Sequence, residues 1–312
     1  MIILEGIINM KLVSVVIPTY KRSEMLKNTI DSVLRQTYEN IEIIIVDDND
    51  PNSKEREMTQ RLMESYKGYK NIKYILHPKN LNGAAARNTG FNNASGYYIA
   101  LLDDDDEFLP KKIESQVKRL EELDDSWGMC YTQFIRKKNG KIIDKGIENK
   151  EGYIGADILK GELYISAGSN LMIRKDIIDE IEGFNENFLR RQDLEFLIRA
   201  SQITKIAHVP EICLVINKDD RSNALSEYKL IKNTNEFLNI FSGYINDLPK
   251  LEKKKVAIGQ YLLLARYYAF NKEFKLMYET CKKNDITLKI FIRYIFYLIK
   301  RKLLKQCYGF KI

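Results

Sequence analysis

Apolar and polar residues alternate in blocks along the first hundred residues of the chain. The β-branched run over 13–18 is typical of a strand that is covered on both faces. Leu26, Ile30 and Val33 then recur at the spacing of one helix face, with Ser23 as the expected N-cap. The same alternation predicts strands over 41–48, 71–76 and 97–102 and helices over 53–66 and 83–94. This order predicts a parallel α/β sheet, whose ligands bind beyond the carboxyl ends of its strands.

The pattern changes after about residue 110. The expected elements are a helix from Pro110, a hairpin at Asn139-Gly140, a strand and a short helix within 163–184 that ends at Gly183, and a helix that starts near 190. The hairpin indicates that the sheet becomes mixed. From residue 226 onward the sequence is helical and rich in lysine. We therefore predict two domains, over 10–225 and 226–312.

Composition narrows the classes of protein. The chain has 312 residues, of which 45% are hydrophobic and 30% are charged, which suits one or two globular domains with a sizeable core. The cysteines form no C-x-x-C pair, which argues against a zinc site or a disulfide framework and favours a reducing cytosol. Since His77 and His208 are the only histidines, a histidine-rich metal site is excluded and a Ser-His-Asp triad has few ways to form. The first ten residues lack the basic start and the cleavage site of a signal peptide.

Four acidic residues, Asp103 to Asp106, directly follow the predicted strand over 97–102. Runs of like charge are usually solvated loops, but the end of a buried strand directs this run toward the ligand cleft. Asp103 and Asp105 stand at D-x-D spacing, and such carboxylates bind Mg²⁺ or Mn²⁺, which share their ligands with phosphate groups. The run therefore predicts a divalent cation with a bound diphosphate.

A second acidic pair, Asp47 and Asp48, closes another predicted strand. One of these carboxylates could accept hydrogen bonds from a base N–H or a ribose hydroxyl. Arg22 and Arg87 lie in segments that follow or adjoin strand ends, and bidentate contacts from their guanidinium groups would offset the repulsion between acids and phosphate. Taken singly, each arginine is more typical of an ordinary surface residue than of a binding site.

Five segments together carry a family resemblance: VVIPTYKR, IIIVDDND, NGAAARNTG, LLDDDDEF and GFNENFLRRQDLEF. In order and spacing they resemble the family 2 glycosyltransferases with the GT-A fold, over about residues 13–220. The resemblance implies an inverting transferase that uses a nucleotide sugar, most often a UDP-sugar. It also implies a GT-A type nucleotide-binding mixed sheet flanked by helices, followed here by a C-terminal helical extension.

The resemblance implies a role for each matched residue. The nucleotide pocket would be lined by Pro18, Thr19, Tyr20 and Arg22, with Asp47 on the base, Asp48 beside it, Arg87 near the diphosphate, and Asp103 and Asp104 near the ribose or metal. Asp105 would be the principal ligand of Mn²⁺ or Mg²⁺, with Asp103 as its partner. Asp193 matches the catalytic base. Gln192 stands where an acid often precedes it, and Glu195 is expected to cap or pair on the same helix.

One segment departs from the family pattern. Many members carry an Arg-x-His segment after the last core strand, whereas this chain has VINKDDRSNALS. Asp219 or Asp220 as a metal ligand, and Arg221 on the diphosphate, are the candidates to replace it. His208 lies earlier and is expected to pack in a strand.

Three other functions compete with glycosyl transfer. A sugar nucleotidyltransferase or a dinucleotide dehydrogenase needs a glycine-rich loop after a strand, and IPTYKRSE has no glycine. A nucleotide-sugar-binding protein without turnover fits the same motifs. The expected acceptor is a glycan or a lipid-linked oligosaccharide in surface polysaccharide synthesis, and nucleic acid is not an expected partner because acids and bases are interspersed.

The C-terminal segment over 286–312 contains seven basic residues and no acid, which equals the net charge of +7 of the whole chain. Its apolar run is shorter than the roughly 20 residues that span a bilayer. We expect an interfacial helix on anionic lipid, which would hold a cytoplasmic enzyme on the inner face of the membrane. Packing of this helix on the catalytic domain is the alternative.

Overall fold

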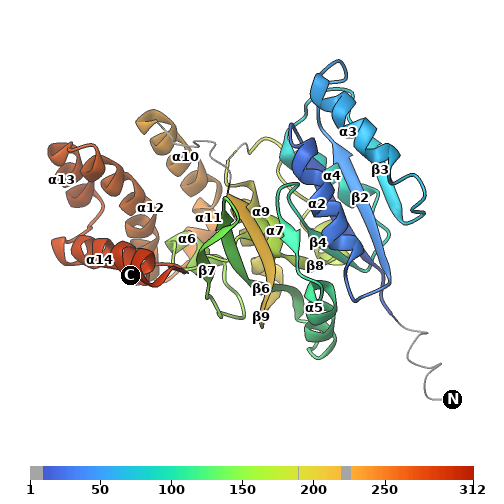
Figure 1. The fold of residues 1–312 in the computed structure, drawn as a ribbon. Coiled ribbons are helices and arrows are strands. Elements are labelled where there is room, and N and C mark those ends of the chain that lie inside the picture. The colour runs from blue at the N-terminus through green and yellow to red at the C-terminus, as the bar shows by residue number, and fades with distance from the viewer. Residues whose placement is uncertain (1–9, 189, 219–225) are drawn as a thin grey trace.

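Strands and helices alternate through the first part of the chain, in a computed structural model that describes residues 10–188, 190–218 and 226–312. The elements are β1 Val13–Thr19, α2 Ser23–Leu34, β2 Ile41–Asp47, α3 Lys54–Glu64, β3 Ile72–Leu76, α4 Gly83–Asn92, β4 Tyr98–Leu101, β5 Glu107–Phe108 and α5 Lys112–Glu121. The strands β4, β1, β2 and β3 are neighbours in that order and run parallel. Figure 1 shows them with their helices on both sides. The predicted parallel α/β arrangement is confirmed.

The next part of the chain continues the same sheet with antiparallel pairs. Its elements are β6 Trp127–Lys138, β7 Lys141–Gly146, α6 Gly155–Lys160, α7 Ala167–Asn170, β8 Met172–Arg174, α8 Lys175–Glu180, α9 Gln192–Ile203 and β9 Lys205–Lys218. β8 lies antiparallel to both β4 and β6, and β9 lies parallel to β6. The predicted hairpin joins β6 to β7, with positive φ angles of 50° at Asn139 and 73° at Gly140. The sheet is therefore mixed, as predicted.

The parallel strands are apolar throughout because helices cover both of their faces. Val13, Val15 and Ile17 point to the core shared with α2, α3 and α5. Val16 of the same strand points to the other face, where α4 and α9 contribute Phe91 and Phe196 to a second core. The polar segments that follow the strands are consequently left at one edge of the sheet, which is where the candidate site lies.

One local expectation was wrong. Ser23 is the first residue of α2 rather than its N-cap, which is Arg22, and no side chain among the described residues caps that end. The strand and the short helix expected within 163–184 are β8 and α8, and the additional short helix α7 precedes them. The buried Asn170 side chain donates to the carbonyls of Thr132 and Ile165, which holds this segment in a turn instead of an extended strand.

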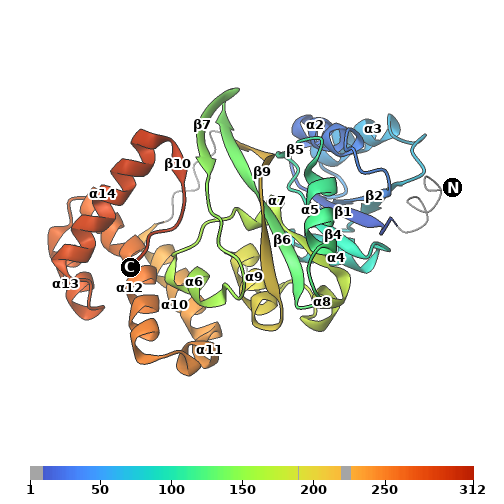
Figure 2. The ribbon, with the colours of Figure 1, turned by 90° about the horizontal axis from the view of Figure 1, so that it is seen from below.

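The C-terminal region is helical, and its elements are α10 Glu227–Ile240, α11 Ser242–Asp247, α12 Lys250–Phe270, α13 Phe274–Lys283, α14 Leu288–Leu304 and the short strand β10 Gln306–Cys307. These helices gather beside α6 and β7, away from β1–β3 (Figures 1 and 2). Phe237, Phe241 and Val256 belong to the core that also contains Phe91 and Phe196, and β10 joins the sheet next to β7. The region is thus packed on the rest of the molecule. The boundary predicted near residue 225 falls outside the described residues.

One face of α14 is packed on another helix of the C-terminal region, α12. Tyr294 is buried against α12, and Cys307 and Phe310 are buried beyond the helix. Among the described helices, none is both long enough and apolar enough to cross a bilayer.

Candidate active site

The four acids after β4 divide into two inward and two outward side chains. The Asp104 carboxylate accepts hydrogen bonds from the Thr19 hydroxyl at 2.8 Å, the Tyr20 backbone N–H at 3.1 Å and Arg22 at 3.1 Å. Asp106 accepts from the Ser169 hydroxyl at 2.6 Å and from the Asn217 backbone N–H at 3.0 Å. Asp104 and Asp106 therefore tie the loop to β1, α7 and β9.

Asp103 and Asp105 are the outward members of the run, and each pairs with an arginine. Arg87 lies 2.5 Å from the Asp103 carboxylate, and Arg22 lies 2.8 Å from that of Asp105. The Asp103 side chain is 33% exposed, compared with 5% for Asp104. Buried and partly exposed side chains thus alternate along the acidic run, so that one loop supplies both structural carboxylates and carboxylates that can face a ligand.

Negative charge is crowded in this loop. Burial raises the pKa of Asp105 to about 7 even though Arg22 opposes the shift, and the neighbouring Asp103 and Asp104 carboxylates add to it. Burial likewise raises the pKa of Asp104 and of Asp106. Since four carboxylates face two guanidinium groups here, a cation placed in this loop would be stabilised.

A cavity of about 380 Å³ opens beside the loop, at the carboxyl ends of the parallel strands. Its lining residues are Pro18, Thr19, Tyr20, Arg22, Asp48, Asn80, Asn82, Gly83, Ala86, Arg87, Asp103 and Asp104. Eight of the residues singled out in the sequence thus come together, and Asp47, Asp105 and Asp193 are not in the lining. The sequence reasoning missed Asn80 and Asn82, although both directly precede the helix that carries Arg87.

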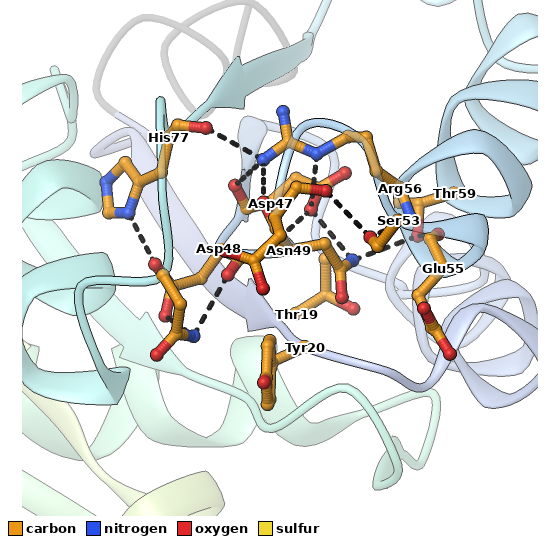
Figure 3. Close-up of polar contacts among 12 residues, drawn as sticks. Thr19, Tyr20, Asp47, Asp48, Asn49, Ser53, Glu55, Arg56, Thr59 and His77 are labelled. Atoms are coloured by element: carbon orange, nitrogen blue, oxygen red, sulfur yellow. Dashed lines mark hydrogen bonds and ion pairs between the residues drawn. The ribbon is translucent and has the colours of Figure 1, made fainter.

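Asp47 and Asp48 have different surroundings despite being adjacent. Asp47 is fully buried, accepts a hydrogen bond from the Tyr74 hydroxyl at 2.5 Å and lies 3.2 Å from Arg56. In Figure 3 the Arg56 side chain reaches over Asp47 toward the His77 carbonyl. Asp47 is therefore a structural carboxylate in this conformation, and the expected contact with the base is available to Asp48 alone of the pair.

The Asp48 carboxylate fixes the loop that precedes α4. It accepts hydrogen bonds from the backbone N–H groups of Leu81 at 2.8 Å and Asn82 at 3.0 Å, and it lies 2.8 Å from the imidazole Nδ1 of His77 (Figure 3). Asn82 in turn caps α4, because its side-chain oxygen accepts from the Ala84 and Ala85 N–H groups. The start of α4 is thereby held against the cavity, where a helix N-terminus favours an anion.

Asp193 lies in the first turn of α9, next to the cavity. The Gln192 amide lies 3.4 Å from the Asn82 side-chain oxygen, which links the starts of α9 and α4. Burial raises the pKa of Asp193, with Arg87 opposing the shift and Asp103 adding to it. A carboxylate with a raised pKa beside the Arg87–Asp103 pair is a stronger base than an exposed aspartate.

Other residues singled out in the sequence have structural partners. Glu195 is buried and pairs with Arg199 at 2.7 Å, so the expected pairing is confirmed. His208 is largely buried in β9, with its ring 5.1 Å from that of Tyr131, which confirms the packing role. Asp219, Asp220 and Arg221 lie outside the described residues. Asn217, just before them, was missed, and its side chain donates to the Asp105 carbonyl at 2.9 Å.

The expected cation is compatible with the donors, but the described residues do not assemble a complete site. Within the described ranges, no group of three or more His, Cys, Asp or Glu side chains is arranged to hold a metal ion. Asp105 lines a neighbouring cavity with Glu107 and Asn217. Oxygen donors from Asp103 and Asp105 are of the type that Mg²⁺ and Mn²⁺ bind when diphosphate oxygens and water supply the other ligands.

Comparison with known proteins agrees with this geometry. The family model described as "Glycosyl transferase family 2" matches residues 14–182. The chain belongs to this family. An uncharacterized glycosyltransferase of Rickettsia felis is 33% identical over 267 residues, which cover 83% of this chain and 42% of the relative. The chain thus spans less than half the length of that relative. The family predicted from the sequence motifs is confirmed.

Two further relatives have more specific names. The amylovoran biosynthesis glycosyltransferase AmsB of Erwinia amylovora is 33% identical over 61% of this chain and 64% of its own length. The GalNAc(5)-diNAcBac-PP-undecaprenol beta-1,3-glucosyltransferase of Campylobacter jejuni is 24% identical and covers 89% of both chains.

Solved structures share the fold at low sequence identity. TarS 1-349 of S. aureus, in complex with UDP-GlcNAc, is 16% identical, with a TM-score of 0.61 over 83% of this chain and 73% of its own. The mannosyltransferase PcManGT of Pyrobaculum calidifontis, with GDP-Man and Mn²⁺, is 14% identical, with a TM-score of 0.59 over 94% and 81%. The expected fold, a mixed sheet flanked by helices with a C-terminal helical region, is confirmed.

Proposed function

We propose that this chain transfers a sugar from a UDP-sugar to a hydroxyl of a glycan or lipid-linked saccharide. The observation that carries the proposal is the cavity at the strand ends, with the Arg87–Asp103 pair on its wall and Asp193 beside that pair. The complex of TarS with UDP-GlcNAc supports a UDP-sugar donor. The name of the Campylobacter relative supports a lipid-linked acceptor.

The donor would lie with its nucleotide between Tyr20 and Asp48 and its diphosphate toward Arg87. Tyr20 is 39% exposed and offers a ring for base stacking. A diphosphate requires nearby positive charge. The N-terminus of α4 supplies the positive end of the helix dipole, and the Arg87 guanidinium supplies a full positive charge. Pro18 and Thr19 complete the wall beside the nucleotide.

Asp103 and Asp105 would hold Mn²⁺ or Mg²⁺ together with the donor. The complex of PcManGT with GDP-Man and Mn²⁺ supports this assignment. A bound divalent cation supplies positive charge that stabilises the departing diphosphate. Its binding would also relieve the crowding of carboxylates that raises the pKa of Asp105.

Asp193 would act as the general base of a single displacement. The acceptor hydroxyl attacks the anomeric carbon from the side opposite the diphosphate, and its proton passes to the Asp193 carboxylate. The bond between the anomeric carbon and the phosphate oxygen breaks, and its electron pair leaves with UDP. One such displacement inverts the anomeric centre. General-base assistance is typically worth about 10²–10⁴-fold in rate.

The outer face of α14 would contact an anionic membrane surface. Leu288, Ile292, Phe296, Ile299 and Leu303 recur at helical spacing and are all exposed, from 45% to 76%. Lys289, Lys300 and Lys302 lie among them. An apolar stripe bordered by lysines is the pattern of a helix that lies in the membrane interface. A lipid-linked acceptor would be presented at such a surface.

Release of UDP from a panel of UDP-sugars, with and without lipid-linked saccharide acceptors, tests the proposal. Acceptor-dependent release is expected with at least one donor. If the chain binds UDP with no release for any combination, a binding protein without turnover is favoured. Release of diphosphate from a nucleoside triphosphate and a sugar phosphate would favour a nucleotidyltransferase instead.

A further inference from the structure

A second cavity of about 320 Å³ lies near the start of α9, between residues 158–194 of the predicted glycosyltransferase domain, called the catalytic half below, and the C-terminal helices. α6 and α9 contribute one wall, and α12, α14 and the segment after β10 contribute the other. The contact between these walls is close. A Cβ atom at Gly259 would lie 1.8 Å from the Lys160 carbonyl oxygen, and one at Gly309 would lie 2.1 Å from the backbone of Glu162. The cavity is therefore formed by two closely packed surfaces.

Three arginines line this cavity without a carboxylate partner among the described residues: Arg191, Arg266 and Arg301. Arg191 donates to the Gln260 side-chain oxygen at 2.7 Å. Arg301 donates to the Tyr297 hydroxyl at 2.8 Å and lies 2.6 Å from the Cys307 sulfur. Neutral groups thus contact Arg191 and Arg301 directly, while the carboxylates of Asp193 and Glu148 act on these two arginines from outside the cavity lining. Burial lowers the pKa of Arg191 although Asp193 opposes the shift, so an anion in the cavity would further stabilise its charged form.

Aromatic rings form the other part of the lining. Tyr297 lies at the centre of a cluster, with ring centroids 5.9 Å from Tyr294, 5.3 Å from Tyr308 and 5.2 Å from Phe310. Tyr164 lines the cavity from the catalytic half. Flat apolar surfaces with a few charged groups are the usual walls of a small-molecule site, and the apolar face of a sugar ring packs well on such rings.

Asp193 lies between the two cavities. Its neighbours in sequence, Arg191 and Leu194, line the second cavity, while Arg87 and Asp103, whose charges act on Asp193, line the first. The charge of Asp193 also acts on Tyr164, whose pKa is raised by burial and further by this carboxylate. A base with one cavity on each side has the arrangement that a displacement between two bound substrates requires.

We propose that the second cavity binds the acceptor as a saccharide carrying a phosphate ester, with the sugar against Tyr164 and Tyr297 and the phosphate near Arg191 and Arg301. This inference rests on the proposed function, since it names the acceptor chemistry for the same base. The phosphate can belong to a lipid-linked saccharide diphosphate or to a soluble sugar phosphate, and the two share the chemistry that the cavity recognises.

Direct binding to the full-length chain tests the assignment without the donor. Calorimetry would compare a hexosamine linked through diphosphate to a short alkyl chain, the hexosamine 1-phosphate, and the neutral octyl glycoside of the same sugar. The two phosphorylated probes are expected to bind. The neutral glycoside should bind at least about ten-fold more weakly, because it cannot form charge-assisted hydrogen bonds with the arginines. Tighter binding of the alkyl diphosphate identifies a lipid-linked source, and equal binding of both phosphorylated probes a soluble one. Equal binding of all three, or of none, overturns the proposal.

Two variants assign the binding to this cavity. Arg301→Gln is expected to weaken the phosphorylated probe about ten-fold, and Arg266→Gln serves as the second variant if Arg301→Gln lowers the melting temperature. Arg293→Gln is the matched control, since it removes the same charge from an exposed position of α14 outside the cavity. Unchanged probe affinity in the folded cavity variants, or an equal loss in Arg293→Gln, overturns the proposal. The affinity for UDP should be the same in all of these variants as in the parent. If the parent itself does not bind UDP, that result contradicts the proposed function but not the proposed second cavity.

Discussion

The cavities on the two sides of Asp193 differ in how the chain builds them. The first is lined by the end of β1 and the residues after it, by residues that follow β2, β3 and β4, and by the start of α4, all within the first third of the chain. The second draws on residues from Ile158 to Phe310, most of them inside helices. One cavity is thus assembled by strand ends that meet at a sheet edge, and the other by the docking of a separate helical region.

This difference explains why the two cavities differ in charge. Acids and arginines alternate around the first, where Arg22 and Arg87 each pair with an aspartate. In the second, Arg191 and Arg301 contact neutral groups, and no acidic residue of the described part of the chain is in the lining. A site for a cation with a diphosphate needs both signs of charge, whereas a site for an anionic group alone needs one. The two linings therefore suit different substrates.

The largest effect is expected from Asp193→Asn, at the boundary between the cavities. Asparagine keeps the size of the side chain and its place in the first turn of α9, but it cannot accept the acceptor proton. Turnover should fall by about 10²–10⁴-fold, equal to about 3–5 kcal/mol of barrier, with UDP-sugar affinity nearly unchanged. Rates and the melting temperature would be measured together. If the folded variant transfers sugar within a few-fold of the parent, the base lies elsewhere.

The pH dependence follows from the same residue. Asp193 acts only when deprotonated, and burial raises its pKa, so kcat/KM should fall as pH decreases through a range above that of an exposed aspartate. A pH–rate profile of the parent checks this. An acid limb that persists unchanged in the residual activity of Asp193→Asn would assign the limb to another group.

The next effect is expected from Tyr20→Ala, which changes only the first cavity. Loss of base stacking should weaken UDP binding by about ten-fold or somewhat more, since a stacked base is worth roughly 1–3 kcal/mol. Tyr20→Phe keeps the ring and is the matched control, with affinity expected near that of the parent. Calorimetric titration with UDP measures both. Equal affinities of Tyr20→Ala and Tyr20→Phe for UDP would show that the Tyr20 ring does not stack on the base.

A smaller effect is expected on removing the divalent cation. Chelation should weaken UDP binding about ten-fold, equal to about 1.4 kcal/mol, and Asp105→Ala should abolish this dependence. Titrations of parent and variant in Mn²⁺ and in chelator make the comparison. If Asp105→Ala binds UDP in Mn²⁺ as tightly as the parent, Asp105 is not the ligand.

The smallest effect is expected at the outer face of α14. Phe296→Ser should lower co-sedimentation with anionic vesicles about five-fold, because partial burial of such a side chain in the interface is worth about 1 kcal/mol. Leu76→Ser removes an exposed apolar residue at the far end of the sheet and is the control. Truncation near residue 284 is unsuitable, since it would also remove β10 from the sheet and Tyr294 from its buried contacts. Equal sedimentation of both variants would contradict contact through this face.

The sequence located part of the first cavity because strand ends can be recognised from apolar runs. Residues after such runs converge at one edge of a sheet, so the sequence predicts that Asp48 and Asp103 lie together there, and it places Tyr20 in the nucleotide pocket only through the family resemblance. It could not distinguish Asp47 from Asp48, because that depends on Arg56 and Tyr74 reaching one carboxylate and not the other. Adjacent acids look alike until the packing around each is known.

No pattern in the sequence indicates the second cavity. Arg191, Arg266 and Arg301 are far apart in the chain, and each resembles an ordinary basic residue of a helix or turn. The sequence predicts a tail over 286–312 that is either interfacial or packed, whereas α14 is buried on one face and exposed on the other. Only the docking of the helices on α6 and α9 brings these arginines together.

Steady-state kinetics with donor and acceptor varied independently test the central claim most directly. The claim is that Asp193 separates a donor cavity from an acceptor cavity. Tyr20→Ala should raise the KM for the UDP-sugar alone, and Arg301→Gln should raise the KM for the phosphate-linked acceptor alone. If both variants raise the KM of the same substrate, or if the parent releases no UDP in response to any such acceptor, the two-cavity account is contradicted.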